Sequence, residues 1–392
     1  MRQTLKILHL ASFVGNVGDT VNHLGFRHWF EALLDNQHVT WTNLEIREFY
    51  WKNKSWDDDL IALINTYDLL VVGGGNYLEL WVKDSPSGTS IGFTMDQLQV
   101  IDVPVFFNAL GFDTHQGVYG DNAEKAKNLL SYLTHDPKRM ITVRNDGAKK
   151  NLTELYGSDF SDLIPMCPDG GFFVDFDSVV DSGSSVQDSE ETVIAINLAC
   201  DMEDVRFKNY VDGSSVGFIE EFAAALTAVS RKNENLKFVF INHVFSDLWS
   251  TFQVLKLLPD EVRRKNVRVS AYDRADRSVV DIINEYRNAD LVIASRFHSN
   301  VLALALNKLV IPLVNYPQIS NLYADVDLSD LAFDVSLPGF EVALGNLIGC
   351  KVDATQLDYD AHILKAGLTE SRLAVEAASK TWLQANNIIA GG

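Results

Sequence analysis

An arginine and a histidine stand close together near the carboxyl end of the chain, in the run Ser295–Asn300 (SRFHSN). The four residues before this run, 291–294, are apolar, as in a buried parallel strand. An apolar helical segment and a second buried strand, 309–314, follow it. The run is therefore predicted to lie at the carboxyl edge of a parallel sheet and at a helix N-terminus, two places that bind ligands and anions. We expect Arg296 and His298 to hold a negatively charged ligand.

Both residues also have a purely structural interpretation. A buried arginine can form a salt bridge, although its planar fork equally suits a carboxylate or phosphate ligand. A histidine at a helix start can act as an N-cap or sit satisfied in the core, or it can serve as a general acid. Three small polar residues of the same turn are candidate donors to the same ligand: Ser295, Ser299 and Asn300.

The surrounding chain alternates apolar strands with helices on both sides of a stretch, 175–191, that is rich in Ser, Asp and Gly. This alternation predicts an α/β protein with two Rossmann-like, doubly wound parallel sheets that face a central cleft. We place an N-terminal domain at 1–177, a linker at 178–191 and a C-terminal domain at 192–358. The helix within 359–392 is long enough to pack back on the N-terminal domain.

Polar residues and glycines also follow the predicted strands of the N-terminal half. Asp19 is either an N-cap carboxylate or a base that binds an acceptor hydroxyl. The glycines at 73–75 allow either a tight turn or close approach of a ligand. Arg144 is either an ion-pair partner or an anion ligand. The remaining candidates at these predicted strand ends are Asn16, Gly18, Gly74, Gly75, Asn76, Asp113 and His115.

Composition excludes several other functions. A net charge of −20, from 53 acidic and 33 basic residues, repels nucleic acid. The three cysteines are far apart, and no histidine spacing or G-x-S-x-G motif indicates a zinc enzyme or a serine hydrolase. We expect no metal and no cofactor. The N-terminus has no apolar signal region and no run is long enough to span a membrane, so we expect a cytoplasmic protein.

Several blocks, taken in order, resemble those of the polysaccharide pyruvyl transferase family. The run Ser295–Asn300 with the strand that ends at Tyr316 is similar to the family's Ser/Thr-Arg-x-His signature. Gly15–Asp19 resembles its N-terminal Asn-x-Gly-Asp loop, and the glycines at 73–75 resemble its glycine-rich turn. Val143–Gly147, with Pro168-Asp169, resembles its mid-chain segments.

The resemblance implies a GT-B-like fold whose N-terminal domain binds the acceptor and whose C-terminal domain binds the donor. It implies transfer of the pyruvyl group of phosphoenolpyruvate to two hydroxyls of a sugar, which gives a cyclic ketal and phosphate. Arg296 would hold the donor's carboxylate or phosphate, with His298 beside it as the acid. Asp19 or Asp113 would be the acceptor-side base.

The chain departs from the family pattern at the strand that begins its C-terminal domain. Many members carry an arginine at the end of this strand, whereas here the strand reads Ile196–Cys200 and has none. Arg206, in the following loop, is the candidate replacement. The acceptor would be a sugar, a lipid-linked oligosaccharide or a polysaccharide, which leaves room for peripheral membrane association. The alternatives are a GT-B glycosyltransferase that uses a nucleotide sugar and a non-catalytic homologue that binds glycans or anions.

Overall fold

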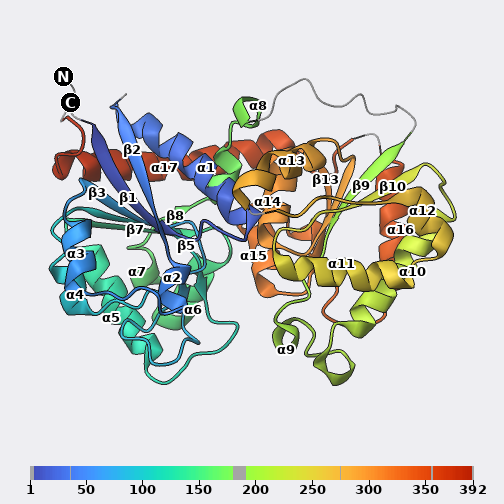
Figure 1. Ribbon diagram of the computed structural model, residues 1–392, viewed down its shortest axis with the longest axis horizontal. Helices are drawn as coiled ribbons and strands as arrows, with labels where there is room; N and C mark the ends of the chain where they lie inside the picture. The colour runs from blue at the N-terminus through green and yellow to red at the C-terminus, as the bar shows by residue number, and fades with distance from the viewer. Residues whose placement is uncertain (1–3, 36, 180–190, 274, 355, 391–392) are drawn as a thin grey trace. The chain divides into compact units, whose positions relative to one another are not determined.

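A computed structural model describes residues 4–35, 37–179, 191–273, 275–354 and 356–390 (Figure 1). The chain divides into two compact units. Unit 1 comprises Met1–Phe13, Asn22–Val174 and Lys365–Gly392, and unit 2 comprises Val14–Val21 and Asp175–Leu364. Most of the predicted linker, 178–191, lies outside the described residues.

Unit 1 is built on a parallel sheet of six strands in the order β2-β1-β3-β5-β7-β8. These strands are β1 (Leu5–Ala11), β2 (Val39–Glu45), β3 (Leu69–Gly73), β5 (Val105–Leu110), β7 (Arg139–Arg144) and β8 (Met166–Cys167). Two further short strands, β4 (Leu78–Glu79) and β6 (Phe112–Asp113), pair with each other.

The strands β1, β3 and β5 of this sheet are mainly apolar because both of their faces are buried. Leu8 and Leu10 of β1 belong to one apolar cluster, whereas Leu5 and Ile7 belong to another. Successive side chains of a strand point to opposite faces, so one strand feeds both clusters. The helices of unit 1 lie on both faces of the sheet (Figure 1). They are α1 (Val17–Leu33), α2 (Arg47–Tyr50), α3 (Asp58–Ile64), α4 (Met95–Gln99), α5 (Asn122–His135), α6 (Ala148–Tyr156), α7 (Ser158–Ser161) and η1 (Gly170–Phe173), together with most of α17 (Ala361–Ala385).

The C-terminal helix α17 packs against the sheet of unit 1. Trp382 lies 6.0 Å from Phe106 between ring centroids, and its indole N–H donates to the carbonyl of Pro137 at 3.0 Å. The Trp29 indole N–H donates to Glu376 at 3.0 Å. Val375 and Leu383 are fully buried in the same apolar cluster as Ile7. Residues from Lys365 onwards are therefore part of unit 1, although they come last in the chain.

Unit 2 repeats the doubly wound plan with strands in the order β11-β10-β9-β12-β13-β14, all parallel. Its strands are β9 (Thr192–Asn197), β10 (Leu236–Phe240), β11 (Val267–Val269), β12 (Leu291–Ala294), β13 (Leu309–Val314) and β14 (Phe333–Asp334). Its helices are α8 (Phe176–Val179), α9 (Glu203–Arg206), η2 (Val211–Gly213), α10 (Val216–Ser230), α11 (Phe245–Leu257), α12 (Asp260–Asn266), α13 (Ala275–Arg287), α14 (Phe297–Ala305), α15 (Pro317–Asp325), η3 (Ser329–Leu331) and α16 (Glu341–Val352).

The strand order of each sheet fixes where a ligand can bind. Open α/β sheets bind ligands at the carboxyl edge where the strand order reverses. In unit 2 this reversal lies between β9 and β12, and in unit 1 it lies between β1 and β3. The prediction of two doubly wound parallel sheets is confirmed. None of the described helices is long and apolar enough to cross a bilayer.

Candidate functional site

The turn singled out in the sequence lies at the point of strand reversal in unit 2. The Ser295 backbone N–H donates to the Asn197 carbonyl at 3.1 Å, and the Ala199 backbone N–H donates to Ser295 Oγ at 2.6 Å. The ends of β9 and β12 are thus tied together beside Arg296, which is the N-cap residue of α14. The structure therefore places the predicted anion site at the edge where this fold binds ligands.

The three small polar residues of the turn face inward. Ser295, Ser299 and Asn300 are fully buried. Asn300 Nδ2 donates to the Arg296 carbonyl at 2.8 Å, and its Oδ1 accepts from the Tyr323 hydroxyl at 2.9 Å. Their predicted contact with a donor stays a prediction, and their burial favours a role in positioning Arg296 and His298.

Two carboxylates hold the Arg296 fork. Its Nε donates to Asp247 Oδ1 at 2.8 Å and to Oδ2 at 2.9 Å, and its Nη2 donates to Asp201 Oδ2 at 2.8 Å. Its Nη1 donates to none of the described residues, and 15% of the side chain is exposed. One edge of the fork is fixed by the protein, and the other can receive a ligand.

Arg206 reaches the same carboxylate. Its Nε lies 3.4 Å from Asp201 Oδ1, its Nη1 donates to Asn315 at 2.9 Å, and its guanidinium lies over the Tyr316 ring at 5.1 Å. Arg206, the predicted replacement for the arginine that many family members carry, therefore shares Asp201 with Arg296. The side chain of Asp201 is 33% exposed, which makes it the accessible carboxylate of the cluster.

The charges in this cluster balance. Burial lowers the pKa of Arg296, but the charges of Asp247 and Asp201 raise it on balance. Burial raises the pKa of Asp201, yet Arg296 and Arg206 lower it on balance. Arg296 and Arg206 thus face two carboxylates, and Arg296 and Asp201 favour each other's charged form.

His298 lies on the first turn of α14, against the segment that opens α1. Its Nδ1 lies 3.8 Å from Asp19 Oδ1, and both side chains are mostly buried. This segment is anchored where the Val17 N–H donates to the His243 carbonyl at 3.1 Å. Two residues that are 279 positions apart in the sequence, Asp19 and His298, thus form a His–Asp pair within unit 2. Such a pair can move a proton at a bound ligand.

Gly18 is required by this contact. A Cβ added at Gly18 would lie 2.4 Å from His298 Cβ, closer than any real carbon contact. Gly18 also donates its N–H to Asn16 Oδ1 at 3.0 Å, which turns the backbone into α1. Asn16 and Gly18 are among the candidates of the half expected to bind the acceptor, and their acceptor-binding role stays a prediction.

We predict that Gly18→Ala lowers the free energy of unfolding by about 1–3 kcal/mol, because the added methyl group overpacks the site. Urea denaturation measures the loss. Gly349→Ala is the matched control in unit 2, since a Cβ there meets nothing within 4 Å on a helix. It should stabilise the protein by up to about 1 kcal/mol. Equal effects of the two substitutions would contradict the steric account.

His243 packs against α14 at Ser299 and stays neutral. It is fully buried, with Nε2 2.9 Å from the Tyr286 hydroxyl and 3.2 Å from Ser299 Oγ. Burial lowers its pKa to about 3, and the nearby His298 and Arg296 add to this effect. A neutral imidazole adds no further charge beside the pair.

Unit 1 holds a second polar cluster, around Arg144. This buried side chain donates to Asp146 Oδ2 through Nε at 2.9 Å and through Nη2 at 2.8 Å. Its Nη1 lies 3.4 Å from Asp169, which also accepts from Asn22 at 2.8 Å. The ion-pair interpretation of Arg144 therefore describes its observed partners, and its predicted donor contact stays a prediction.

The glycine run of unit 1 is packed tightly by the protein itself. A Cβ on Gly73 would lie 2.2 Å from the Asn108 carbonyl oxygen, and one on Gly75 would lie 2.5 Å from the Tyr77 ring. Gly74 has a φ of +80°, and its carbonyl accepts from Asn22 Nδ2 at 3.2 Å. Internal packing is sufficient to require these glycines, and the predicted acceptor contacts of Gly74 and Gly75 stay predictions.

Asp113 is one of a pair of carboxylates on the small sheet of unit 1. The register of β4 and β6 sets Glu79 beside Asp113, and Asn76 Nδ2 lies 3.2 Å from Glu79 and 3.3 Å from Asp113. The His115 N–H donates to Asp113 at 2.7 Å. Burial raises the pKa of Glu79 to about 7, and Asp113 adds to the rise. Glu79 was not among the residues predicted from the sequence, where its one signal was that it is a carboxylate within the apolar run 77–80.

The raised pKa of Glu79 predicts a pH effect on stability. Between pH 4.5 and 7 the folded protein keeps this proton while the unfolded chain loses it, so stability falls as the pH rises. Glu79→Gln keeps the shape and removes the charge. It should stabilise the protein by about 1 kcal/mol at pH 8 and by little at pH 4. Urea unfolding at both pH values measures this, and an equal effect at both would refute it.

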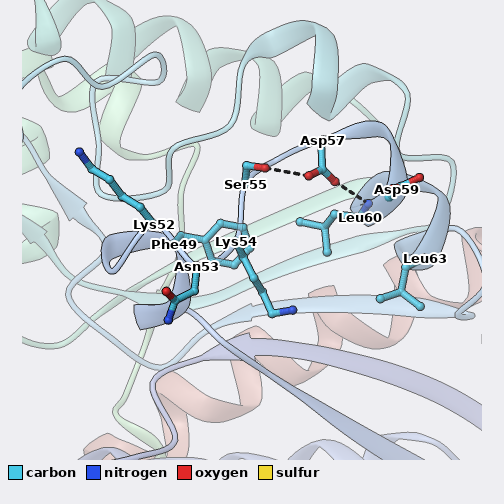
Figure 2. Close-up of a pocket in the computed structure, with 9 residues that line it drawn as sticks. All are labelled: Phe49, Lys52, Asn53, Lys54, Ser55, Asp57, Asp59, Leu60 and Leu63. Atoms are coloured by element: carbon cyan, nitrogen blue, oxygen red, sulfur yellow. Dashed lines mark hydrogen bonds between the residues drawn. The ribbon is translucent and has the colours of Figure 1, made fainter.

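A pocket of about 550 Å³ on unit 1 lies between the 52–55 loop and α3 (Figure 2). Two of its polar groups form the N-cap of α3. Ser55 Oγ donates to Asp57 Oδ2 at 2.7 Å, and Asp57 Oδ1 caps α3 by accepting from the Leu60 N–H at 3.0 Å. None of the site residues predicted from the sequence lines this pocket.

Comparison with protein families decides the relationship. The model of the family described as polysaccharide pyruvyl transferase matches residues 16–316, which is more than half of the chain. The chain belongs to the polysaccharide pyruvyl transferase family. The match includes both the Asp19 segment and the turn with Arg296 and His298. No match was found among curated proteins.

Solved structures show the fold of this pyruvyl transferase family member. A putative UDP-N-acetylglucosamine 2-epimerase from Listeria monocytogenes has a TM-score of 0.58 at 10% identity, covering 98% of both chains. A glycosyltransferase from Rickettsia africae has a TM-score of 0.55 at 14% identity, covering 98% of this chain and 99% of the other. S. aureus MnaA, solved with UDP, has a TM-score of 0.55 at 12% identity, covering 99% and 98%. The fold is GT-B-like, with two Rossmann-like units, as predicted.

Proposed function

We propose that this family member transfers the pyruvyl group of phosphoenolpyruvate to two hydroxyls of a sugar in a glycan or glycan precursor, in the cytoplasm. The products are a cyclic ketal and phosphate. The observation that carries the proposal is the half-held fork of Arg296, which has one open edge and stands two residues before His298 at the ligand-binding edge of unit 2. The family membership supports the same chemistry.

Arg296 and Arg206 would receive the donor's carboxylate or phosphate, because guanidinium groups bind such anions with two parallel hydrogen bonds. His298 would then protonate C3 of the donor, which leaves C2 open to attack by the first sugar hydroxyl. The second hydroxyl attacks C2 next, and the C2–O bond to phosphate breaks. The two hydroxyls lose one proton each. One of these protons replaces the proton that His298 gave to C3, and the other goes to the released phosphate. Asp19 would accept one of them as the base.

Asp201 lies between the two arginines, so its negative charge would repel an anionic donor held at the open edge of Arg296. This repulsion costs binding energy. We predict that Asp201→Asn tightens phosphoenolpyruvate binding by at least about tenfold, equivalent to about 1.4 kcal/mol. Isothermal titration measures this. Asp204→Asn on the neighbouring helix α9 is the control and should leave affinity unchanged. Weaker binding by Asp201→Asn would place Asp201 among the ligand's own contacts.

A ligand-binding experiment tests the function itself. Phosphoenolpyruvate should raise the melting temperature of the full chain, and UDP and GDP should not. Incubation with phosphoenolpyruvate and glycan acceptors should release phosphate in proportion to the ketal formed. Stabilisation by UDP alone would favour the nucleotide-sugar glycosyltransferase. Binding of phosphoenolpyruvate without turnover on any acceptor would favour a non-catalytic homologue.

A further inference from the structure

Helix α11 buries mostly polar side chains and exposes several aromatic ones. Its buried face carries Asp247, Ser250 and Thr251, with Val254 as the one apolar residue among the buried positions. Asp247 serves Arg296, and Thr251 donates to Asn242 at 2.8 Å. A helix on the surface of a globular protein normally buries its apolar side chains and exposes its polar ones. In α11 the buried face is polar because it supports the site.

The solvent face of α11 is a row of aromatic rings. Phe245 is 76% exposed, Trp249 60% and Phe252 54%. They recur at spacings of four and three residues, so they follow one face of the helix. Lys256 continues the row, with its ammonium group 5.7 Å from the Phe252 ring centroid. Single exposed apolar residues are ordinary, but a contiguous row marks a surface that binds something.

This aromatic row of Phe245, Trp249 and Phe252 is linked through Tyr272 to the segment that carries Asp19. The Phe245 ring lies 6.5 Å from the Tyr272 ring, and the Tyr272 hydroxyl lies 3.5 Å from the carbonyl oxygen of Gly15. Gly15 opens the segment that carries Asp19. A ligand whose reacting end lies at His298 and Asp19 could therefore extend over Tyr272 and along α11 without leaving unit 2.

Area and charge distinguish between the occupants of this row. At their exposed fractions the three rings offer roughly 300–450 Å². A stable dimer needs about 800 Å² from each partner, so the row alone is too small for a second copy. The net charge of −20 opposes an anionic membrane surface. Gln253 and Lys256 flank the rings and supply hydrogen-bonding groups that hydroxyls can use and lipid tails cannot.

We infer that the row on α11 is an extended subsite for a glycan acceptor of several sugar units. The C–H faces of pyranose rings are weakly positive and stack on the negative faces of aromatic rings. A narrow line of rings therefore suits a linear oligosaccharide better than a broad protein surface. The inference rests on the proposed function, because it takes the reacting sugar to lie at His298 and Asp19 and the rest of the chain to lie along α11.

The test uses the full chain and an array of linear gluco-, galacto- and manno-oligosaccharides of one to eight units. The wild type should bind chains of four or more units at least about tenfold more tightly than monosaccharides. Trp249→Ala with Phe252→Ala should remove that gain. Val342→Ala, at an equally exposed apolar residue of α16, is the matched control and should keep it. All variants should keep the wild-type affinity for phosphoenolpyruvate and the wild-type circular dichroism spectrum.

The outcomes separate the subsite from the function. Oligosaccharide binding that the double substitution leaves unchanged overturns the subsite, and so does a wild type that binds phosphoenolpyruvate but no oligosaccharide. Capture of the wild type by phosphatidylcholine vesicles, lost in the double variant, would make the row a membrane contact instead. If the protein bound longer glycans more tightly but did not bind phosphoenolpyruvate, the aromatic row would remain a glycan-binding surface and the proposed pyruvyl transfer would be contradicted.

Discussion

Replacing His298 with alanine is expected to slow phosphate release from phosphoenolpyruvate by about 10²–10⁴-fold, the usual contribution of a general acid. The imidazole lies on the first turn of α14, two residues after the N-cap residue Arg296. It has Asp19 at 3.8 Å as the partner that can orient it. The substitution removes the proton donor but leaves the Arg296 fork intact, so affinity for phosphoenolpyruvate should change little.

Steady-state kinetics and isothermal titration on the same preparation separate these two effects. His28→Ala, at an exposed histidine of α1, is the matched control and should retain wild-type turnover. Added imidazole should restore part of the lost rate, because it can fill the space and carry the proton. Turnover near that of the wild type with unchanged donor affinity would remove His298 from the mechanism. A loss of donor affinity alone would make it a ligand of the anion.

The strands around the site could be predicted because both of their faces are buried. Residues 291–294 and 309–314 form continuous apolar runs, and these match β12 and β13 at both ends. By contrast, α12 was not foreseen, because it has little apolar periodicity. Ion pairs between residues four apart stabilise it instead, from Arg264 to Asp260 and from Lys265 to Glu261. Strands β4 and β6 have two residues each, which is too short for any periodic signal.

The site could be predicted only as far as local sequence reaches. Arg296 and His298 stand out because a strand and a helix meet at them. The partners that fix the Arg296 fork come from distant segments, since Asp247 is 49 residues away in the sequence and Asp201 is 95. No spacing rule connects such residues before the strands are placed in order. For the glycines at 73–75 the local sequence allows two explanations. It shows that something approaches the backbone closely, but not whether this is a ligand or, as in the structure, Asn108.

The second large effect concerns Asp247, the partner that orients the arginine. Its side chain is 1% exposed and also accepts the His243 N–H at 2.9 Å and Asn197 Nδ2 at 3.2 Å. Asp247→Asn removes its charge and turns an amide N–H₂ toward these donors. Breaking a buried ion pair in this way should lower the free energy of unfolding by about 3–5 kcal/mol. Activity should fall with it, because Arg296 then loses its fixed edge.

Urea denaturation of Asp247→Asn against Asp260→Asn measures this effect. Asp260 is 65% exposed and pairs with Arg263 and Arg264 on α12, so its loss should cost less than about 1 kcal/mol. The double variant Asp247→Leu with Arg296→Met removes both charges and should regain much of the stability, but none of the activity. That separation follows if the ion pair as a unit contributes little to stability and Asp247 acts by orienting the Arg296 guanidinium group toward the donor. A double variant that regained activity would show that this orientation is not needed.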